Sequence, residues 1–380
     1  MKCQRNKFSL QRKISYLNGA YMSPLLKKVE KAGIKGMIKK RKPFHLAPSD
    51  FFKETEVLRN LFGQLINSPE SARHVIIPSV SYGIENVVQN LEKKKGNIVL
   101  AAGQFPSNVY PWSANPHYQL KFVAAPTEAK NQCAALNEYI LAAIDDQTAA
   151  VSIGQVHWVN GIKYDLTSIR QKTRAVGAAL IIDGTQSIGA LPFDVQEVQP
   201  DALVVAGYKW LMGPYSIGMA YYGEMFDQGR PIENNWINRQ GADQFSGLTH
   251  YQDNFLPGAQ RYEVGEHSNF ILVPMLIAAI KQLLKWTPLG IQQYCEALCH
   301  DAIDILRSEG YTVEASEGRA SHLFGVYFNR NTTMERIEQA LFKHRVKISV
   351  RDQALRISPN VYNDQKDVQR LVRALKEAII

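Results

Sequence analysis

The sequence predicts an α/β fold in which helices cover both faces of a mainly parallel sheet, followed by a smaller α+β unit. Between residues 74 and 222, short apolar runs bounded by turn residues alternate with segments of helical apolar spacing. This alternation is typical of a parallel sheet. Beyond about residue 260, two helices precede short strands and helices in mixed order. We therefore expect a basic arm at 1–14, a large domain at 15–260 and a small domain at 261–380.

The large domain opens with a turn and two helices. Residues 15–24 contain Asn-Gly, which is a turn signal. A polar, basic helix is predicted at 27–42, where Pro43 ends it, and a second helix at 50–65 has apolar residues at helical spacing. The predicted strands of the sheet then span residues 74–78, 97–101, 118–124, 149–156, 180–182, 202–206 and 218–222. The helices between them are predicted at 84–94, 137–144 and 164–176.

The remainder of the chain reads as a loop-rich segment at 223–257 and then the small domain. Its predicted helices lie at 270–286, 291–309, 334–344 and 365–379. Its predicted strands lie near residue 313 and at 323–328, 348–351 and 355–358.

Charged and polar side chains stand at the ends of several predicted strands. Asp183 ends one apolar run, and Lys209 follows another. Ligands bind at the carboxyl ends of strands in such sheets, so this edge is the expected site. The turn 79–83 joins a strand to a helix, which makes a weak anion-site signal on its own. Lys209 taken alone would be read as a surface lysine; together with its neighbours it indicates a site.

A lysine whose pKa is lowered by burial can form a Schiff base with pyridoxal phosphate. That cofactor needs a carboxylate at its ring nitrogen, a cradle for its phosphate and a flat side chain on its ring. Asp183, the Ser81–Gly83 turn and Phe105 offer these three groups at predicted strand ends.

Composition excludes several other classes. No apolar run reaches the length of a membrane span, no signal peptide is present, and four cysteines in 380 residues give no disulfide framework, so we expect a cytoplasmic protein. Residues 1–42 hold 13 Lys/Arg and one acid, a net +12, whereas the rest of the chain has 31 basic and 34 acidic residues, a net −3. A solvated helix face, steering of anionic substrates and nucleic-acid binding are all open explanations, but no motif supports nucleic acid. Cys295, Cys299 and His300 lack a second ligand cluster, so no metal is expected.

Four segments together resemble the class V aminotransferase family of pyridoxal-phosphate enzymes: SYLNGAYMSP, DGTQSIGALPFDV, GYKWLMGP and LRISPNVYN. The resemblance covers nearly the whole chain. This family, which also includes cysteine desulfurases, selenocysteine lyases and kynureninases, has fold type I. The resemblance therefore implies a seven-stranded-type sheet sandwiched by helices, and a homodimer with shared active sites.

The resemblance also implies roles for individual residues. Lys209 matches the Schiff-base lysine, and Asp183 matches the partner of the pyridine nitrogen. The other expected cofactor-binding residues are Gln186 at the phenolic oxygen, Phe105 on the ring, Tyr82 and Gly83 at the phosphate, and Tyr208, Trp158 and Trp236 around them. Trp236 is expected to act across a subunit boundary. Arg356, or else Arg351, is the expected anchor of the substrate carboxylate.

Two departures from the family pattern narrow the activity. Ala206 replaces a frequent Ser or Thr, and Tyr208 replaces the more usual His, as in kynureninases. The loop 352–354 has no cysteine, which disfavours a cysteine desulfurase. We expect an aminotransferase that acts on an amino acid or related amine through a Lys209 Schiff base. A β-lyase or hydrolase resembling kynureninase or selenocysteine lyase is the first alternative. Racemisation, decarboxylation and a non-catalytic regulatory homologue stay open.

Overall fold

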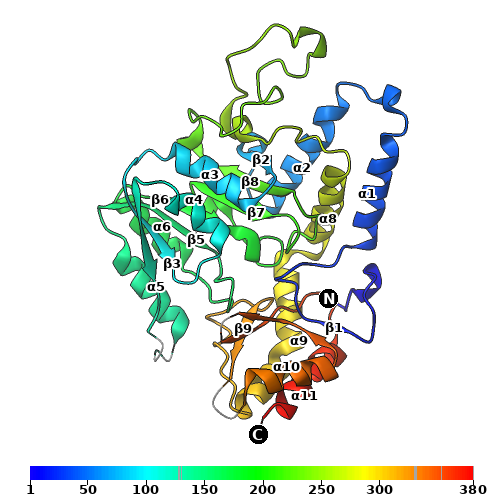
Figure 1. The fold of residues 1–380 in the computed structure, drawn as a ribbon, viewed down its shortest axis with the longest axis vertical. Helices are drawn as coiled ribbons and strands as arrows, with labels where there is room; N and C mark the ends of the chain where they lie inside the picture. Colours follow the sequence, from blue (N-terminus) through cyan, green and yellow to red (C-terminus); the bar gives the residue numbers. More distant parts are fainter. Residues whose placement is uncertain (127–128, 130, 329–331, 352, 380) are drawn as a thin grey trace.

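The computed structural model describes residues 1–126, 129, 131–328, 332–351 and 353–379, and its centre is a seven-stranded sheet (Figure 1). The strand order is β2-β8-β7-β6-β5-β3-β4. Strand β8 runs antiparallel to both of its neighbours, and the other six strands share one direction. The predicted seven-stranded, mainly parallel sheet is thus confirmed. Its strands are β2 (His74–Ile77), β3 (Gly96–Ala101), β4 (Tyr118–Val123), β5 (Thr148–Gly154), β6 (Ala179–Asp183), β7 (Ala202–Ala206) and β8 (Gly218–Tyr222).

Helices cover both faces of this sheet because its inner strands are apolar on both sides. Along β6, Leu180 and Ile182 belong to one buried cluster, whereas Ile181 belongs to another. Successive side chains of a strand point to opposite faces, so the two clusters mark the two faces. The first cluster includes residues of α2 (Asp50–Ile66), α5 (Gln132–Ala143), α6 (Leu166–Ala175) and α8 (Leu272–Trp286). The second includes residues of α3 (Val80–Asn90) and α4 (Tyr110–Ser113).

The C-terminal part forms a second, smaller layer below the large sheet in Figure 1. Its antiparallel sheet has the order β11-β12-β9, from β9 (Phe324–Tyr327), β11 (Ser349–Arg351) and β12 (Ala354–Ile357). Helices α9 (Pro288–Ser308), α10 (Met334–Lys343) and α11 (Gln365–Glu377) share a third buried cluster with these strands. The expected strand near residue 313 is wrong, because only an isolated bridge joins Thr312 to Tyr327. The division of the chain at residue 260 stays a prediction.

Several element boundaries differ from the predicted ones, and side-chain caps explain most of the differences. Helix α3 begins at Val80, because the Ser79 hydroxyl accepts a hydrogen bond from the Tyr82 amide. Helix α5 begins five residues before the predicted start, where Asn131 caps it. Helix α9 begins at Pro288, with Thr287 as its cap. Helix α1 (Lys27–Lys39) ends three residues before the predicted end, and the backbone amide of its C-cap, Lys40, donates to the Ile38 carbonyl.

One strand pair joins the two ends of the chain. Strand β1 (Ser15–Tyr16) pairs in parallel with β10 (Val346–Lys347). The sequence analysis did not predict this pair, because two residues carry no periodic pattern. The pairing ties the N-terminal segment to the small C-terminal layer, which brings Ala20 and Tyr21 toward the large sheet's site edge.

The segment between β8 and α8 projects from the top of the molecule in Figure 1. Within it the structure forms short 3-10 helices, such as Glu224–Phe226 and Phe245–Gly247, and one isolated antiparallel bridge between Arg239 and Phe255, as the loop-rich composition predicts. Tyr251, which belongs to this segment, is 94% exposed. We call residues 229–257 the projecting loop.

The described residues form neither a single membrane-spanning helix nor a metal-binding cluster. No single helix among them is long and apolar enough to cross a membrane, although α8 and α9 pass this test as a pair bent by 67°. No group of three or more His, Cys, Asp or Glu side chains in the same part of the chain is placed to hold a metal ion.

Candidate active site

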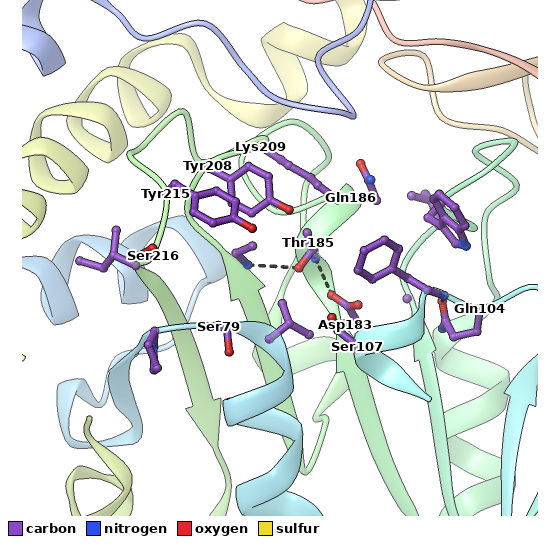
Figure 2. A pocket seen from close by; sticks show the side chains of 18 residues that line it. Ser79, Gln104, Ser107, Asp183, Thr185, Gln186, Tyr208, Lys209, Tyr215 and Ser216 are labelled. Carbon is purple, nitrogen blue, oxygen red and sulfur yellow. Dashed lines mark hydrogen bonds between the residues drawn. The ribbon is translucent and has the colours of Figure 1, made fainter. Parts of the chain in front are cut away.

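A cavity opens at the edge of the large sheet where the parallel strands end (Figure 2). Its volume is about 980 Å³ with the open mouth included, which is a typical size for a small-molecule site. We call it the Asp183 cavity. Its lining comes from the segments that follow β2, β3, β5, β6 and β7 and from the turn before β8: Ser79, Val80, Gln104, Phe105, Ser107, Trp158, Asp183, Thr185, Gln186, Tyr208, Lys209, Tyr215 and Ser216.

Lys209 enters this cavity from the turn that follows β7. The residue is only 5% exposed, and its Nζ makes no hydrogen bond to any described residue. It lies 5.0 Å from the centroid of the Phe105 ring and 5.6 Å from that of Tyr208. Burial lowers the pKa of Lys209 to about 8, against the opposing effect of the Asp183 charge. The amine is therefore partly uncharged near neutral pH.

Asp183 is the carboxylate of the same cavity. It ends β6, and its Oδ1 accepts a hydrogen bond of 3.0 Å from the Thr185 amide. Burial raises the pKa of Asp183, and the Thr185 hydrogen bonds oppose this rise. The Thr185 hydroxyl in turn accepts a hydrogen bond from the Ala206 amide, so Thr185 links the ends of β6 and β7, as Figure 2 shows. This link fixes the spacing of the strand ends that bear Asp183 and Lys209.

Two aromatic side chains form one wall. Phe105 follows β3, and its ring meets the Trp158 indole edge-to-face with 5.3 Å between centroids. The indole Nε1 donates to the Gly103 carbonyl at 2.6 Å, which holds Trp158 in place. Both residues line the cavity, as expected of groups that contact a flat ligand.

The predicted turn 79–83 meets the cavity at its first two residues. Ser79 and Val80 line the cavity, whereas Tyr82 and Gly83 do not. The Tyr82 hydroxyl donates to Glu233 at 3.0 Å, and a side chain at Gly83 would collide with Val204. Tyr82 and Gly83 lie in the first turn of α3, which begins at Val80, and their expected contact with the cofactor phosphate stays a prediction. The start of α3 still presents its free amide groups at this end.

Gln186 and Tyr208 both line the cavity as expected. The Gln186 side chain is already bonded on both sides, because its Nε2 donates to the Ala20 carbonyl and its Oε1 accepts from the Trp210 indole. One amide hydrogen remains for a ligand. The Tyr208 ring contacts that of Tyr215 with 4.6 Å between centroids.

Sequence reasoning missed Tyr215 and Ser216. Both lie in the turn before β8, and Figure 2 shows them at the same cavity as Lys209. Because β8 runs against its neighbours, its start, not its end, lies at the site edge. The Gly/Pro turn ahead of β8 was the available signal, since the eleven residues 207–217 are too short a connection for a parallel crossover.

A second cavity, of about 720 Å³ with its mouth, adjoins the first. We call it the Arg356 cavity. Phe105, Trp158, Tyr208, Lys209 and Tyr215 line both cavities, so the two meet at Lys209. Its remaining lining residues are Ala20, Tyr21, Met22, Arg351 and Arg356. The two arginines that the sequence singles out therefore lie together beside the lysine.

Trp236 is not brought to the site within one chain. It lies on the projecting loop, is 40% exposed and packs against Phe245. Neither the Asp183 cavity nor the Arg356 cavity includes it. Its predicted role depends on a second subunit and stays a prediction.

The four cysteines, all within the described residues, lie away from both cavities. Cys295 and Cys299 are buried on α9, and burial raises the pKa of each thiol. Asp352, in the short loop 352–354 whose lack of cysteine disfavours a desulfurase, lies outside the described residues.

Comparison with known proteins gives consistent matches over the chain. The family model described as "Aminotransferase class-V" matches residues 38–371. An uncharacterized aminotransferase, YcbU, of Bacillus subtilis (strain 168) is 25% identical over 322 residues, which are 84% of this chain and 82% of that protein. A cysteine desulfurase of Yersinia pestis bv. Antiqua (strain Angola) is 26% identical over 271 residues, which are 68% of this chain and 63% of that protein.

Solved structures share the fold at low sequence identity. The cysteine desulfurase CsdA of Escherichia coli superposes with a TM-score of 0.81 at 19% identity, covering 99% of this chain and 98% of that one. The cystine C-S lyase C-DES superposes with a TM-score of 0.83 at 18% identity, covering 97% and 99% of the two chains.

Proposed function

Because the chain belongs to the class V aminotransferase family of pyridoxal-phosphate enzymes, we propose that it transfers the amino group of an amino acid or related amine, with Lys209 as catalytic base. The observation that carries this proposal is the buried, partly uncharged Lys209 amine in the same cavity as the Asp183 carboxylate. A base that removes a proton from carbon works best when its pKa lies near the working pH.

The Asp183 cavity fits pyridoxal phosphate. The Asp183 carboxylate would accept a hydrogen bond from the protonated pyridine nitrogen and keep it protonated, and Phe105 would lie on the ring. Ser79, the free amides at the start of α3 and Ser216 would hold the phosphate. Lys209, whose Nζ lies 5.0 Å from the centroid of the Phe105 ring, would bond the cofactor covalently. When bound, the cofactor supplies an electron-accepting ring for reactions at the α-carbon of an amine.

The protein's own residues then hold the substrate and move one proton. Arg356 is 1% exposed, and its guanidinium would bind the substrate carboxylate in a bidentate manner. This anchor fixes the α-carbon beside Lys209, because both residues line the Arg356 cavity. The Lys209 Nζ removes the α-proton and returns a proton to a neighbouring carbon, so one amine serves as base and then as acid. The Phe105 and Trp158 rings exclude water from this position.

Elimination of a substituent from the β-carbon is the second candidate. Tyr208 favours it, since its ring lies 5.6 Å from the Lys209 Nζ. Burial raises the pKa of Tyr208 to about 12, so its hydroxyl keeps its proton and can donate it to a leaving group. Aminotransfer needs no such second acid.

We also propose that the protein acts as a homodimer in the cytoplasm. The exposed Trp236 and the tip of the projecting loop support a partner subunit, because neither completes a site within its own chain. The four free cysteines fit a reducing compartment. Sedimentation of the purified protein tests the dimer, and a monomer at working concentration would contradict it.

A spectral screen of the holoenzyme with individual amino acids tests the main proposal. Conversion of the cofactor to its pyridoxamine form, with a keto acid as product, is the result expected for aminotransfer. A keto product with the original spectrum restored would show the lyase reaction instead. Borohydride reduction and mass spectrometry should find the cofactor on Lys209; K209A should abolish this label, while the exposed-site control K366A should keep it. Colourless protein without a label at Lys209 would contradict the enzyme proposal.

A further inference from the structure

The Arg356 cavity contains two guanidinium groups against one indole ring. The Cζ atoms of Arg356 and Arg351 lie 5.5 and 5.8 Å from the centroid of the Trp158 ring. The register of the small sheet puts them there: Arg351 pairs with Ala354, which lies two residues from Arg356 on β12. Side chains two apart on a strand share a face, so both arginines point to the same side of the hairpin.

No described carboxylate neutralises either arginine. Arg356 donates to the Trp158 carbonyl at 3.2 Å and to the Ser349 hydroxyl at 3.4 Å, and its buried Nε has no partner among the described residues. Arg351 donates to the Val350 carbonyl at 2.7 Å. Burial, and then the charge of Arg351, lower the pKa of Arg356 to about 10. Holding two like charges together in a partly buried cavity is costly unless an anion joins them.

The phosphate of the cofactor does not supply that anion. Ser79, Val80 and Asp183 line the Asp183 cavity and not the Arg356 cavity, whereas neither arginine lines the Asp183 cavity. The phosphate end and the arginine pair thus lie in different compartments that meet at Lys209. The arginines face the compartment left for the substrate.

We propose that the substrate is an amino acid with a second anionic group on its side chain, such as a carboxylate, with Arg356 binding the α-carboxylate and Arg351 the side-chain anion. This inference rests on the proposed function. One carboxylate occupies one guanidinium when it binds side-on, which leaves the second guanidinium for a second anion.

The burial of the two arginines decides which of them takes which group. Arg356 is fully buried and Arg351 only partly, so Arg356 lies deeper in the cavity. The α-carboxylate must lie beside the carbon that reacts at Lys209, and Arg356 perturbs Lys209 more strongly than Arg351 does. The side chain of the substrate then extends toward the mouth, where Arg351, Tyr21 and Tyr215 lie.

Binding of unreactive acids to the holoenzyme tests this assignment without any turnover. Calorimetry would compare succinate with butyrate and glutarate with pentanoate, since each pair has the same chain length but differs by one carboxylate. We expect at least one diacid to bind about 10- to 100-fold more tightly than its partner, the usual gain from a hydrogen bond between charged groups. Equal binding within both pairs would overturn the proposal.

Variants assign the selectivity to one residue. R351Q should remove most of the preference for the diacid and leave the monoacid within about twofold. R373Q, which removes an exposed arginine on α11, should keep the preference and controls for the loss of one charge. If R351Q weakens diacid and monoacid alike, Arg351 does not read the side chain and the assignment is wrong.

Turnover separates this inference from the function on which it rests. Aspartate or glutamate should react with a higher kcat/KM than asparagine or glutamine, and R351Q should narrow that ratio about 10-fold or more. An enzyme that reacts equally well with neutral or aromatic amino acids would refute the substrate class and keep the function. A holoenzyme that binds diacids selectively but reacts with no amino acid would refute the function and keep the site.

Discussion

The pH at which Lys209 becomes reactive follows from its burial. With a pKa of about 8, about 9% of the amine is uncharged at pH 7 and about 91% at pH 9, so the reactive fraction rises about tenfold and then levels off. A lysine with an ordinary pKa near 10.4 would instead rise about 100-fold over the same interval without levelling off. The two cases therefore differ in how much the uncharged fraction rises between pH 7 and 9 and in whether the rise levels off.

Capture of pyridoxal phosphate by the apoenzyme measures this fraction. Stopped-flow rates between pH 6.5 and 9.5 should level off above about pH 8, as the pKa of Lys209 requires. A parallel series with Nα-acetyl-lysine corrects for the ionisations of the cofactor itself. In R351Q the midpoint should move upward, because the charge of Arg351 lowers the pKa of Lys209, whereas R373Q should leave it in place. A rate that still climbs steeply at pH 9.5, or a midpoint that moves downward in R351Q, would refute this reasoning.

Two further predictions concern stability. Arg59 binds Glu263 at 2.8 Å with side chains 8% and 1% exposed, so R59M should lower the free energy of unfolding by about 3–5 kcal/mol by leaving a buried charge. K343M, which breaks the exposed ion pair with Glu377, should lower the free energy of unfolding by less than about 1 kcal/mol. Denaturant titration of both variants measures these losses, and equal losses in R59M and K343M would contradict the burial argument. Burial lowers the pKa of His74 to about 4, below its unfolded value, so the neutral ring stabilises the fold above pH 6.5 and this contribution is lost as the pH falls toward 4. The free energy of unfolding should therefore fall less in H74Q than in the wild type between pH 6.5 and 4.5, by up to about 3 kcal/mol, and the melting temperature should fall less steeply as well. An unchanged dependence of the melting temperature on pH would exclude His74 as the cause of this fall.

The sequence predicts the large sheet well because its strands are short apolar runs with clear ends. It also predicts that Asp183, Phe105 and Lys209 meet, because the ends of parallel strands share one edge. It does not predict the direction of β8, and so Tyr215 and Ser216 were missed. Strand direction depends on the connection and on neighbouring strands, which a local apolar pattern does not encode.

Other errors have local causes. The start of α3 was predicted four residues too late because the cap at Ser79 was not recognised. The closeness of Arg351 and Arg356 depends on the register of β11 with β12, and the loop between them does not fix a register from sequence alone. Their contact with Trp158, about 200 residues away in the chain, depends on how the small layer packs against the large sheet.

The two cavities draw their distinctive residues from separate parts of the chain, and the hairpin of β11 and β12 supplies one of these parts. Every residue that lines only the Asp183 cavity comes from positions 78–217, whereas both arginines come from this one hairpin near the end of the chain. Under the proposed assignment, a change in the hairpin would alter which acids are accepted and would leave the strand ends beside the Asp183 cavity as they are. If the assignment holds, exchange of a few residues on these two strands would change the substrate while the cofactor chemistry stays the same.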